Sequence, residues 1–317
     1  MKKNKHKIIT FTVLFSAATV VIHFVNKLTA ATASLKEMLD TSGRNFYQWR
    51  FGKIHYTKRG KGSPILLVHD TTPGASGYEW NKIEKQLAME HTVYNVDLLG
   101  WGRSDKPGIT YTNFLYVQML CDFVKNIIGE KTEVIVSGFS SSFVLMACHN
   151  KKECFDKVMM VNPPSLNSLN QMPSQKDKLF KFFIELPVFG TLLYHMLVSH
   201  ENINNIFIEK LYYNPFHVDK DVVDAYYEGA HTGGYYCKNS YASKVSKYMN
   251  LSIGHALKEL DHSLYLVEGE GEPNSDSVIQ EYKSVNAAIE TVKLNRTKHL
   301  PQLEDPEQFL EQVGIFF

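Results

Sequence analysis

Three consecutive serines follow a short β-branched run and could supply a nucleophile. The segment 134–143 reads VIVSGFSSSF, with one glycine between the apolar run and the serines. A serine in a tight turn between a strand and a helix stands above the sheet, and such a turn needs small residues two positions before and after it. Gly138 and Ser142 are those neighbours, so the spacing predicts Ser140 as a nucleophile.

Two features of this stretch leave another reading open. Ser142 adds a CH₂OH group where a glycine would leave more room for the strained backbone. Serine is also a preferred N-cap residue, so Ser140 could simply cap a helix that begins at Ser141. That structural role would also explain a serine cluster at this place.

A serine hydroxyl needs a histidine base and a carboxylate that orients the base. His299 follows the last expected strand and precedes a helix that Asp305 and Pro306 would open. The turn before it, EGEGEPNSD at 268–276, contains several acids. We assign Glu272, which lies between Gly271 and Pro273. The residues alone leave three other carboxylates open, namely Glu268, Glu270 and Asp276.

A parallel α/β sheet would bring these groups together. Strands that are buried on both faces read as continuous apolar runs with amphipathic helices between them. Six such runs occur, at 64–70, 92–98, 133–138, 157–163, 263–270 and 288–295. Alternating apolar and polar residues at 46–60, around Gly52, predict an antiparallel hairpin before them.

The strand rhythm stops between residues 168 and 257, where helical spacing and many Phe, Tyr and Leu residues predict an inserted helical subdomain. We therefore expect a core formed by 45–167 and 258–317, with 168–257 as a helical cap. A cap over the carboxyl ends of parallel strands would cover the crevice in which such sheets bind ligands.

The N-terminus predicts a membrane anchor. Lys2, Lys3, Lys5 and Lys7 precede an uncharged apolar run of 18 residues from Ile8 to Val25, close to the length that spans a hydrocarbon core of roughly 30 Å. A cleaved signal is the alternative, because Ala31-Thr32-Ala33 could be a cleavage site. The basic flank favours residues 1–33 as a cytoplasmic stub with a single span, and an extracytoplasmic domain.

Composition narrows the partners. The chain has 34 Lys and Arg against 33 Asp and Glu, and its basic residues form no block beyond the first few positions, so we expect no nucleic-acid partner. The four cysteines (Cys121, Cys148, Cys154 and Cys237) follow no CxxC spacing, which predicts free thiols rather than zinc or disulfides. We expect neither a metal nor an organic cofactor.

From about Phe46 to Phe317, outside the insertion, the chain resembles the α/β-hydrolase superfamily, in the branch of esterases, haloalkane dehalogenases and epoxide hydrolases. The stretches that carry the resemblance are GKIHYTKRGKGSPILLVHD, YEWNKIEKQLAMEHTVYNVDLLGWGRSDKP, GFSSS and HLPQLEDPEQFL. The basic anchor followed by this domain also resembles membrane-anchored α/β hydrolases of Gram-positive bacteria. The resemblance implies an eight-stranded sheet with a helical cap. A serine at the tight turn between strand and helix, the nucleophile elbow of this superfamily, points towards an acyl-serine route and away from the branch's aspartyl-ester route.

The chain departs from that branch at HDTTPGAS, residues 69–76, because Asp70 stands where the branch has glycine. An ionised carboxylate beside a developing oxyanion would oppose it. We expect the N–H of Ser141 to be one oxyanion donor and Thr71 or Thr72 to supply the second.

Three functions follow from the sequence. The first is a serine carboxylesterase or lipase-like enzyme that cleaves a small apolar ester or lipid at a membrane. The second is a degenerate hydrolase fold that binds a hydrophobic ligand or partner without turnover. The third is a peptidase or carbon–carbon hydrolase, because fold does not decide chemistry.

Overall fold

The computed structural model describes residues 2–39 and 45–317; Met1, part of the expected cytoplasmic stub, lies outside the described residues. Eight strands form one sheet with the order β1-β2-β4-β3-β5-β6-β7-β8. Their bounds are β1 Asn45–Trp49, β2 Gly52–Arg59, β3 Ser63–Val68, β4 His91–Val96, β5 Thr132–Ser137, β6 Phe155–Val161, β7 Leu264–Gly269 and β8 Glu290–Leu294.

The expected parallel sheet and hairpin are confirmed. β1 and β2 pair antiparallel, and β2 also pairs antiparallel with β4. All other neighbours, from β4 through β3 to β8, are parallel. The carboxyl ends of these parallel strands therefore meet at one edge, where an α/β sheet binds ligands.

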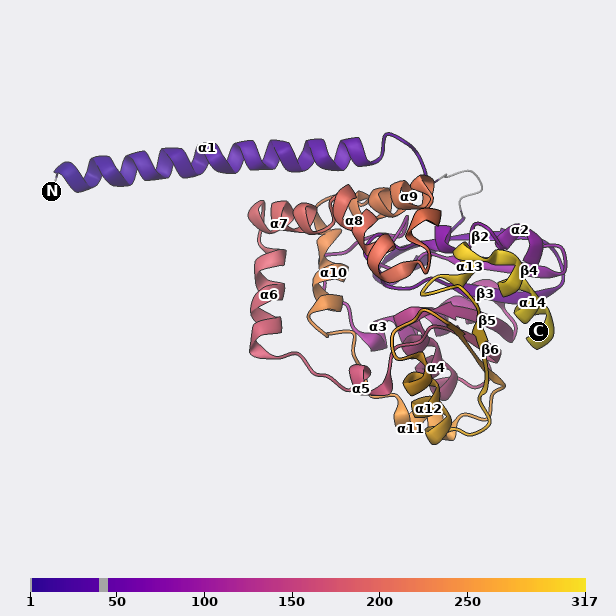
Figure 1. Ribbon diagram of the computed structural model, residues 1–317. Coiled ribbons are helices and arrows are strands. Elements are labelled where there is room, and N and C mark those ends of the chain that lie inside the picture. Colours follow the sequence, from indigo (N-terminus) through magenta and orange to yellow (C-terminus); the bar gives the residue numbers. More distant parts are fainter. Residues whose placement is uncertain (1, 40–44) are drawn as a thin grey trace.

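Helices cover both faces of the sheet (Figure 1). Leu66 and Val68 of β3 belong to one apolar cluster with residues of α3 and α4, whereas Ile65 and Leu67 face the other way, towards residues of α2 and α14. The bounds of these helices, with the remaining two of the core, are α2 Glu84–Leu87, α3 Asn113–Phe123, α4 Ser141–Asn150, α12 Ser275–Val285, α13 Pro301–Glu304 and α14 Pro306–Phe316.

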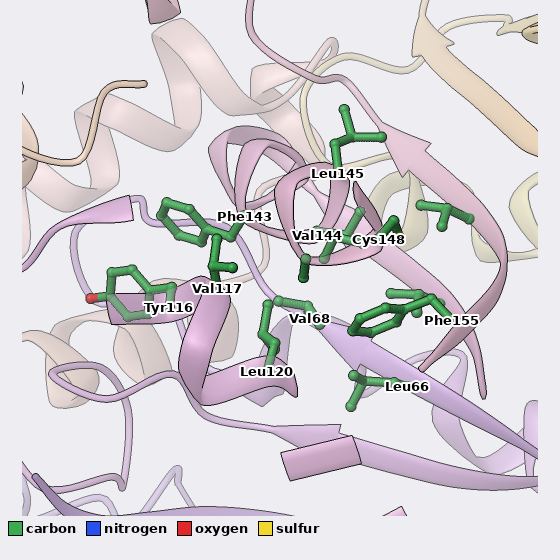
Figure 2. Packing of buried hydrophobic residues seen from close by; sticks show 14 of the residues in the cluster. Leu66, Val68, Tyr116, Val117, Leu120, Phe143, Val144, Leu145, Cys148 and Phe155 are labelled. Atoms are coloured by element: carbon green, nitrogen blue, oxygen red, sulfur yellow. The ribbon is translucent and has the colours of Figure 1, made fainter. Parts of the chain in front are cut away.

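The helix that follows β5 is fixed by apolar packing. Figure 2 shows Phe143 and Val144 of α4 in one packed group with Val68 of β3 and with Val117 and Leu120 of α3. All five side chains are buried. The turn between β5 and α4 is therefore held between two rigid elements.

Between β6 and β7 the described residues form helices and loops without a strand. Most of these helices pack around an apolar cluster of their own, which also includes Ala75 and Leu300 from the loops at the carboxyl end of the sheet. Leu169 and Leu257 belong instead to the apolar cluster of the sheet. The α-helices of this segment are α5 Leu166–Leu169, α6 Gln175–Glu185, α7 Phe189–Leu197, α8 His200–Ile206, α9 Lys220–His231, α10 Lys238–Val245 and α11 Gly254–Glu259.

Helix α1, Lys2–Ala33, projects from the body of the molecule (Figure 1). Within its stretch His6–Ala33, an 18-residue window reaches a mean hydropathy of 2.2, and the stretch is largely exposed. Length and composition allow this helix to cross a membrane, and a signal sequence would have the same properties.

Candidate active site

The turn between β5 and α4 is made by Gly138. Its φ of +54° lies in the left-handed region, which favours glycine. Ser140, two residues later, has helical angles (φ −63°, ψ −17°) and ends the short 3₁₀ turn Gly138–Ser140. The residue held above the sheet by the strained turn is therefore Gly138, whereas the sequence spacing predicts Ser140.

The Ser140 hydroxyl is bonded to a backbone carbonyl of the loop that carries Asp70. The serine side chain is fully buried, and its Oγ donates a hydrogen bond of 2.7 Å to the His69 carbonyl. The hydrogen bonds of the described residues include none between Ser140 and His299. Nor does the Ser140 side chain cap α4. The structure thus differs from both roles that the sequence suggests for this serine.

His299 and Glu272 lie together. The histidine Nδ1 is 3.1 Å from Glu272 Oε1, in the turn that follows β7. The other three acids of that turn point elsewhere: Glu268 is buried in β7, Glu270 accepts the backbone N–H of Arg296, and Asp276 pairs with Lys293. Of the four carboxylates, Glu272 is the one in position to orient the imidazole.

Asp70 occupies the other side of the imidazole. Its Oδ2 is 3.4 Å from His299 Nε2 and also accepts the hydroxyl of Thr72. Its Oδ1 accepts the backbone N–H of Phe139 at 2.7 Å. Asp70, His299 and Glu272 therefore form a continuous chain of polar contacts in which no serine takes part.

The expected oxyanion donors are placed differently. The N–H of Ser141 donates to the carbonyls of Gly138 and Phe139 within the turn. The backbone donor that points into the site is that of Phe139, the residue after Gly138. Thr72 contributes its hydroxyl to Asp70, and the Thr71 hydroxyl is buried without a partner.

Opposite charges fix the protonation states at this site. Burial alone would lower the pKa of His299, but hydrogen bonds and charges from Asp70 and Glu272 raise it well above its usual range. Burial would likewise raise the pKa of Asp70, but contacts with His299, Lys244 and Thr72 hold it well below its ordinary value. These contacts favour the protonated form of the His299 imidazole beside Asp70 and Glu272.

Glu79 holds the loop that carries Asp70. Its Oε2 accepts the backbone N–H of Asp70 at 3.1 Å, and its Oε1 accepts Gln302 Nε2 at 2.9 Å. Burial, with the nearby charge of Asp70, raises the pKa of Glu79 to about 7. Near neutral pH Glu79 therefore carries less negative charge behind Asp70 than an ordinary glutamate would.

Asn162, just after β6, ties the histidine loop to the turn after β7. Its Nδ2 donates to the carbonyls of Lys298 and His299, at 2.7 and 3.0 Å. Its Oδ1 accepts the backbone N–H of Gly269 at 2.8 Å. The residue has a positive φ of 45°, so its backbone is constrained together with both loops.

The polar groups are only partly open to solvent. The side chains of His299, Glu272 and Asp70 are 17%, 22% and 8% exposed. Five surface cavities described for this structure are all lined by other residues. Among the described residues, no cluster of His, Cys, Asp or Glu is arranged to hold a metal ion.

The structure brings the predicted His299 and Glu272 together, but the left-handed turn lies at Gly138 rather than at Ser140. The sequence contains a signal for this, because glycine is the residue in SGFSSS that adopts a left-handed turn without strain. Asp70 stood out as a departure, yet its contact with His299 depends on two loops 229 residues apart. Nothing in the sequence around Asn162 marks its role.

Comparison with known proteins places this geometry in context. A family model described as "Alpha/beta hydrolase family" matches residues 65–312. The chain is 38% identical over 74 residues to a 2-hydroxy-6-oxo-6-(2'-aminophenyl)hexa-2,4-dienoic acid hydrolase of Metapseudomonas resinovorans, covering 23% of this chain and 26% of the relative. It is 38% identical over 60 residues to a haloalkane dehalogenase of Agrobacterium fabrum, covering 19% of each. These matches span about a fifth to a quarter of the relatives' length.

The whole fold has counterparts among solved structures. The crystal structure of a serine hydrolase involved in carbazole degradation superimposes with a TM-score of 0.71 at 17% identity, over 86% of this chain and 97% of that one. At this identity the likeness concerns the fold alone.

Proposed function

Because the chain belongs to the alpha/beta hydrolase family, we propose that it is a hydrolase in which the Asp70 carboxylate, rather than the Ser140 hydroxyl, is the nucleophile. One observation carries the proposal. Asp70 reaches both the backbone N–H after the elbow glycine and the imidazole of the His299–Glu272 pair. These are the two contacts that a nucleophile needs at the carboxyl edge of this sheet.

The substrate class follows from the nucleophile. A carboxylate can displace a leaving group at carbon and form an alkyl ester, as in the aspartyl-ester route of the dehalogenase and epoxide hydrolase branch that the sequence resembles. The haloalkane dehalogenase among the relatives agrees with this choice. We therefore propose a small apolar epoxide or alkyl halide as substrate, because Asp70 and His299 are mostly buried and the apolar cluster of the neighbouring helices is rich in aromatic residues.

The first half-reaction forms the ester. Asp70 Oδ2 attacks the electrophilic carbon, and the carbon–oxygen or carbon–halogen bond breaks. With an epoxide, the His299 imidazolium gives its Nε2 proton to the alkoxide; with a halide, the anion leaves without this proton, and the imidazolium then releases the proton to solvent. In either case Asp70 loses its negative charge, which removes one of the two carboxylates that raise the pKa of His299.

The second half-reaction releases the product. His299, as a neutral imidazole oriented by Glu272, takes a proton from water while the oxygen adds to Cγ of the ester. The Phe139 N–H, which already contacts Oδ1, stabilises the oxyanion. Collapse of the intermediate releases the alcohol and restores Asp70. The sum is addition of water to an epoxide, or replacement of halide by hydroxyl with release of a proton.

The esterase route through Ser140 has less support. A serine nucleophile must lose its proton to a neutral imidazole, whereas the Ser140 hydroxyl is bonded to the His69 carbonyl and His299 is held as a cation. Peptidase or carbon–carbon hydrolase chemistry through the same serine meets the same obstacle.

Two further parts of the proposal concern the setting of the site. We propose that the helices of 168–257 act as its cap, since their apolar cluster includes Ala75 and Leu300 from the loops around Asp70 and His299. We also propose that α1 anchors the protein in a membrane with the domain on the extracytoplasmic side. The exposed apolar surface of α1 supports the anchor, and the basic flank supports the orientation.

Hydrolysis assays test this function. The full chain is purified in detergent, and release of diol or halide is measured with 1,2-epoxyalkanes and 1-haloalkanes of increasing length. We expect turnover in the wild type and in Ser140→Ala, and loss of turnover in Asp70→Asn. Turnover that survives in Asp70→Asn but disappears in Ser140→Ala would contradict the proposal.

A second candidate is binding of an apolar ligand without turnover. It is favoured by the ion pairs on both imidazole nitrogens, which leave His299 without a site that can accept a proton. In that case the full substrate panel gives no product, and apolar ligands raise the melting temperature of the wild type.

A further inference from the structure

An apolar surface lies on α6 and α7, two consecutive helices of the proposed cap. Seven large apolar side chains of α6 and α7 are exposed, and two of them, Phe182 and Met196, are 58% and 61% exposed. The others are Leu179, Phe180, Phe183, Phe189 and Leu193. We call this set the α6–α7 surface. Contiguous exposed apolar groups of this size mark a protein or membrane contact rather than an ordinary solvated face.

The α6–α7 surface is continuous with α1. The ring of Phe189 stacks on Phe15 at a centroid distance of 5.5 Å, and Asn26 Nδ2 donates to the Val188 carbonyl at 2.9 Å. Figure 1 shows α1 running alongside α7, with α6 turning away from it. Phe15 lies within the apolar run that begins at Ile8. Lipid that surrounds α1 at Phe15 must therefore also surround the start of α7.

The charges of α6 suit the boundary of a bilayer. Lys176 and Lys178 are exposed in its first turns, beside Leu179 and the phenylalanines that follow. Such lysines place their stems along apolar surface and their ammonium groups among lipid head groups. Phe182 and Phe183 are exposed one turn further on, as in amphipathic helices that lie in a membrane interface.

Neither helix is long enough to cross a membrane by itself. Helices α6 and α7 have 11 and 9 residues and meet at an angle of 107°. A transmembrane helix needs about 20 residues. Each helix is short enough to lie within one leaflet, and the sharp bend between them fits a surface contact with that leaflet.

We propose that the α6–α7 surface is embedded in the lipid leaflet that surrounds α1, so that the protein contacts the bilayer through its proposed cap as well as through its anchor. This inference is independent of the chemistry at Asp70. It places the edge of the cap in contact with the hydrocarbon region of the bilayer, in which an apolar substrate dissolves.

Depth-dependent fluorescence quenching tests the proposal on the full chain. The protein is reconstituted in phosphatidylcholine–phosphatidylglycerol nanodiscs, with and without lipids that carry a doxyl quencher on the acyl chain. Phe182→Trp and Met196→Trp report the α6–α7 surface, and Phe11→Trp reports α1. Phe216→Trp is the matched control, because Phe216 is 94% exposed on the Pro215–His217 turn. The native tryptophans Trp49, Trp80 and Trp101 are buried and give a common background.

We expect doxyl lipids to remove most of the added emission of Phe182→Trp, Met196→Trp and Phe11→Trp and little of that of Phe216→Trp. Quenching at Phe11→Trp alone would keep α1 in the membrane and overturn the proposal for the cap. Equal quenching of Phe216→Trp would also overturn it. A blue shift at Phe182→Trp without quenching, together with two protein copies per nanodisc, would assign the surface to a second copy.

Discussion

The carboxylate of Asp70 fills the space into which a side chain at Gly138 would project. A Cβ atom built on Gly138 would lie 2.3 Å from Asp70 Oδ1 and 2.4 Å from its Cγ. These are distances at which two non-bonded atoms cannot coexist. One loop therefore supplies the carboxylate, and the strained turn of the other leaves room for it.

This relationship predicts how the two positions depend on each other. Gly138→Ser alone should lose most folded protein or stability, because the new side chain collides with Asp70. The double variant Gly138→Ser with Asp70→Gly removes the collision and leaves His299 paired with Glu272. We expect the introduced serine to react with a fluorophosphonate probe, measured by peptide mapping. A folded but unreactive double variant would show that position 138 is not the nucleophile position.

The wild-type protein should resist the same probe. Ser140 is fully buried and bonded to the His69 carbonyl, so we expect no adduct on it by intact mass. Ser140→Ala should lose one hydrogen bond, worth about 1 kcal/mol of unfolding free energy, and keep its turnover. Stoichiometric labelling of Ser140, lost in Ser140→Ala, would restore the acyl-serine route.

The protonation of His299 should depend on Asp70. Its pKa is raised by Asp70 and Glu272, so Asp70→Asn should lower it, and Glu272→Gln should do likewise. A ¹³C-histidine NMR titration of the full chain in detergent measures this. Because the folded pKa is raised, the pair stabilises the fold below pH 6.5, and that contribution is lost as the pH rises through the folded pKa. An identical His299 titration in Asp70→Asn would contradict the observed contact.

Glu79 should make the protein less stable as the pH rises. Burial raises the pKa of this carboxyl from its ordinary 4.5 to about 7, so the folded state keeps a proton that the unfolded chain loses. The stabilisation is complete below pH 4.5 and is lost towards pH 7, by up to about 3 kcal/mol. Urea denaturation between pH 4.5 and 7.5 should therefore show a smaller decline in Glu79→Gln than in the wild type. Parallel curves for the two proteins would argue that Glu79 is ionised throughout.

The sheet could be predicted from sequence because strands buried on both faces leave a pattern that does not depend on other parts of the chain. The contact between His299 and Glu272 agrees with the sequence prediction. The loops that carry these two residues come directly after the last two strands, which the sequence pattern locates. The position of the strained turn after β5 could not be predicted from the sequence. The spacing of small residues points to Ser140, and only the backbone angle of Gly138 shows that the left-handed turn lies two residues earlier. The role of Asp70 depends on three-dimensional proximity to His299, which no local pattern records.

The covalent adduct at Asp70 tests the central claim most directly. In His299→Gln the base for the second half-reaction is absent, whereas displacement of a halide needs no proton from this residue, so the alkyl ester should accumulate when this variant is incubated with a 1-haloalkane. Peptide mapping should then find the added alkyl mass on Asp70, and the same treatment of His299→Gln with Asp70→Asn should leave the peptide unmodified. An adduct on Ser140, or none on a folded variant whose wild type turns the compound over, would contradict Asp70 as the nucleophile.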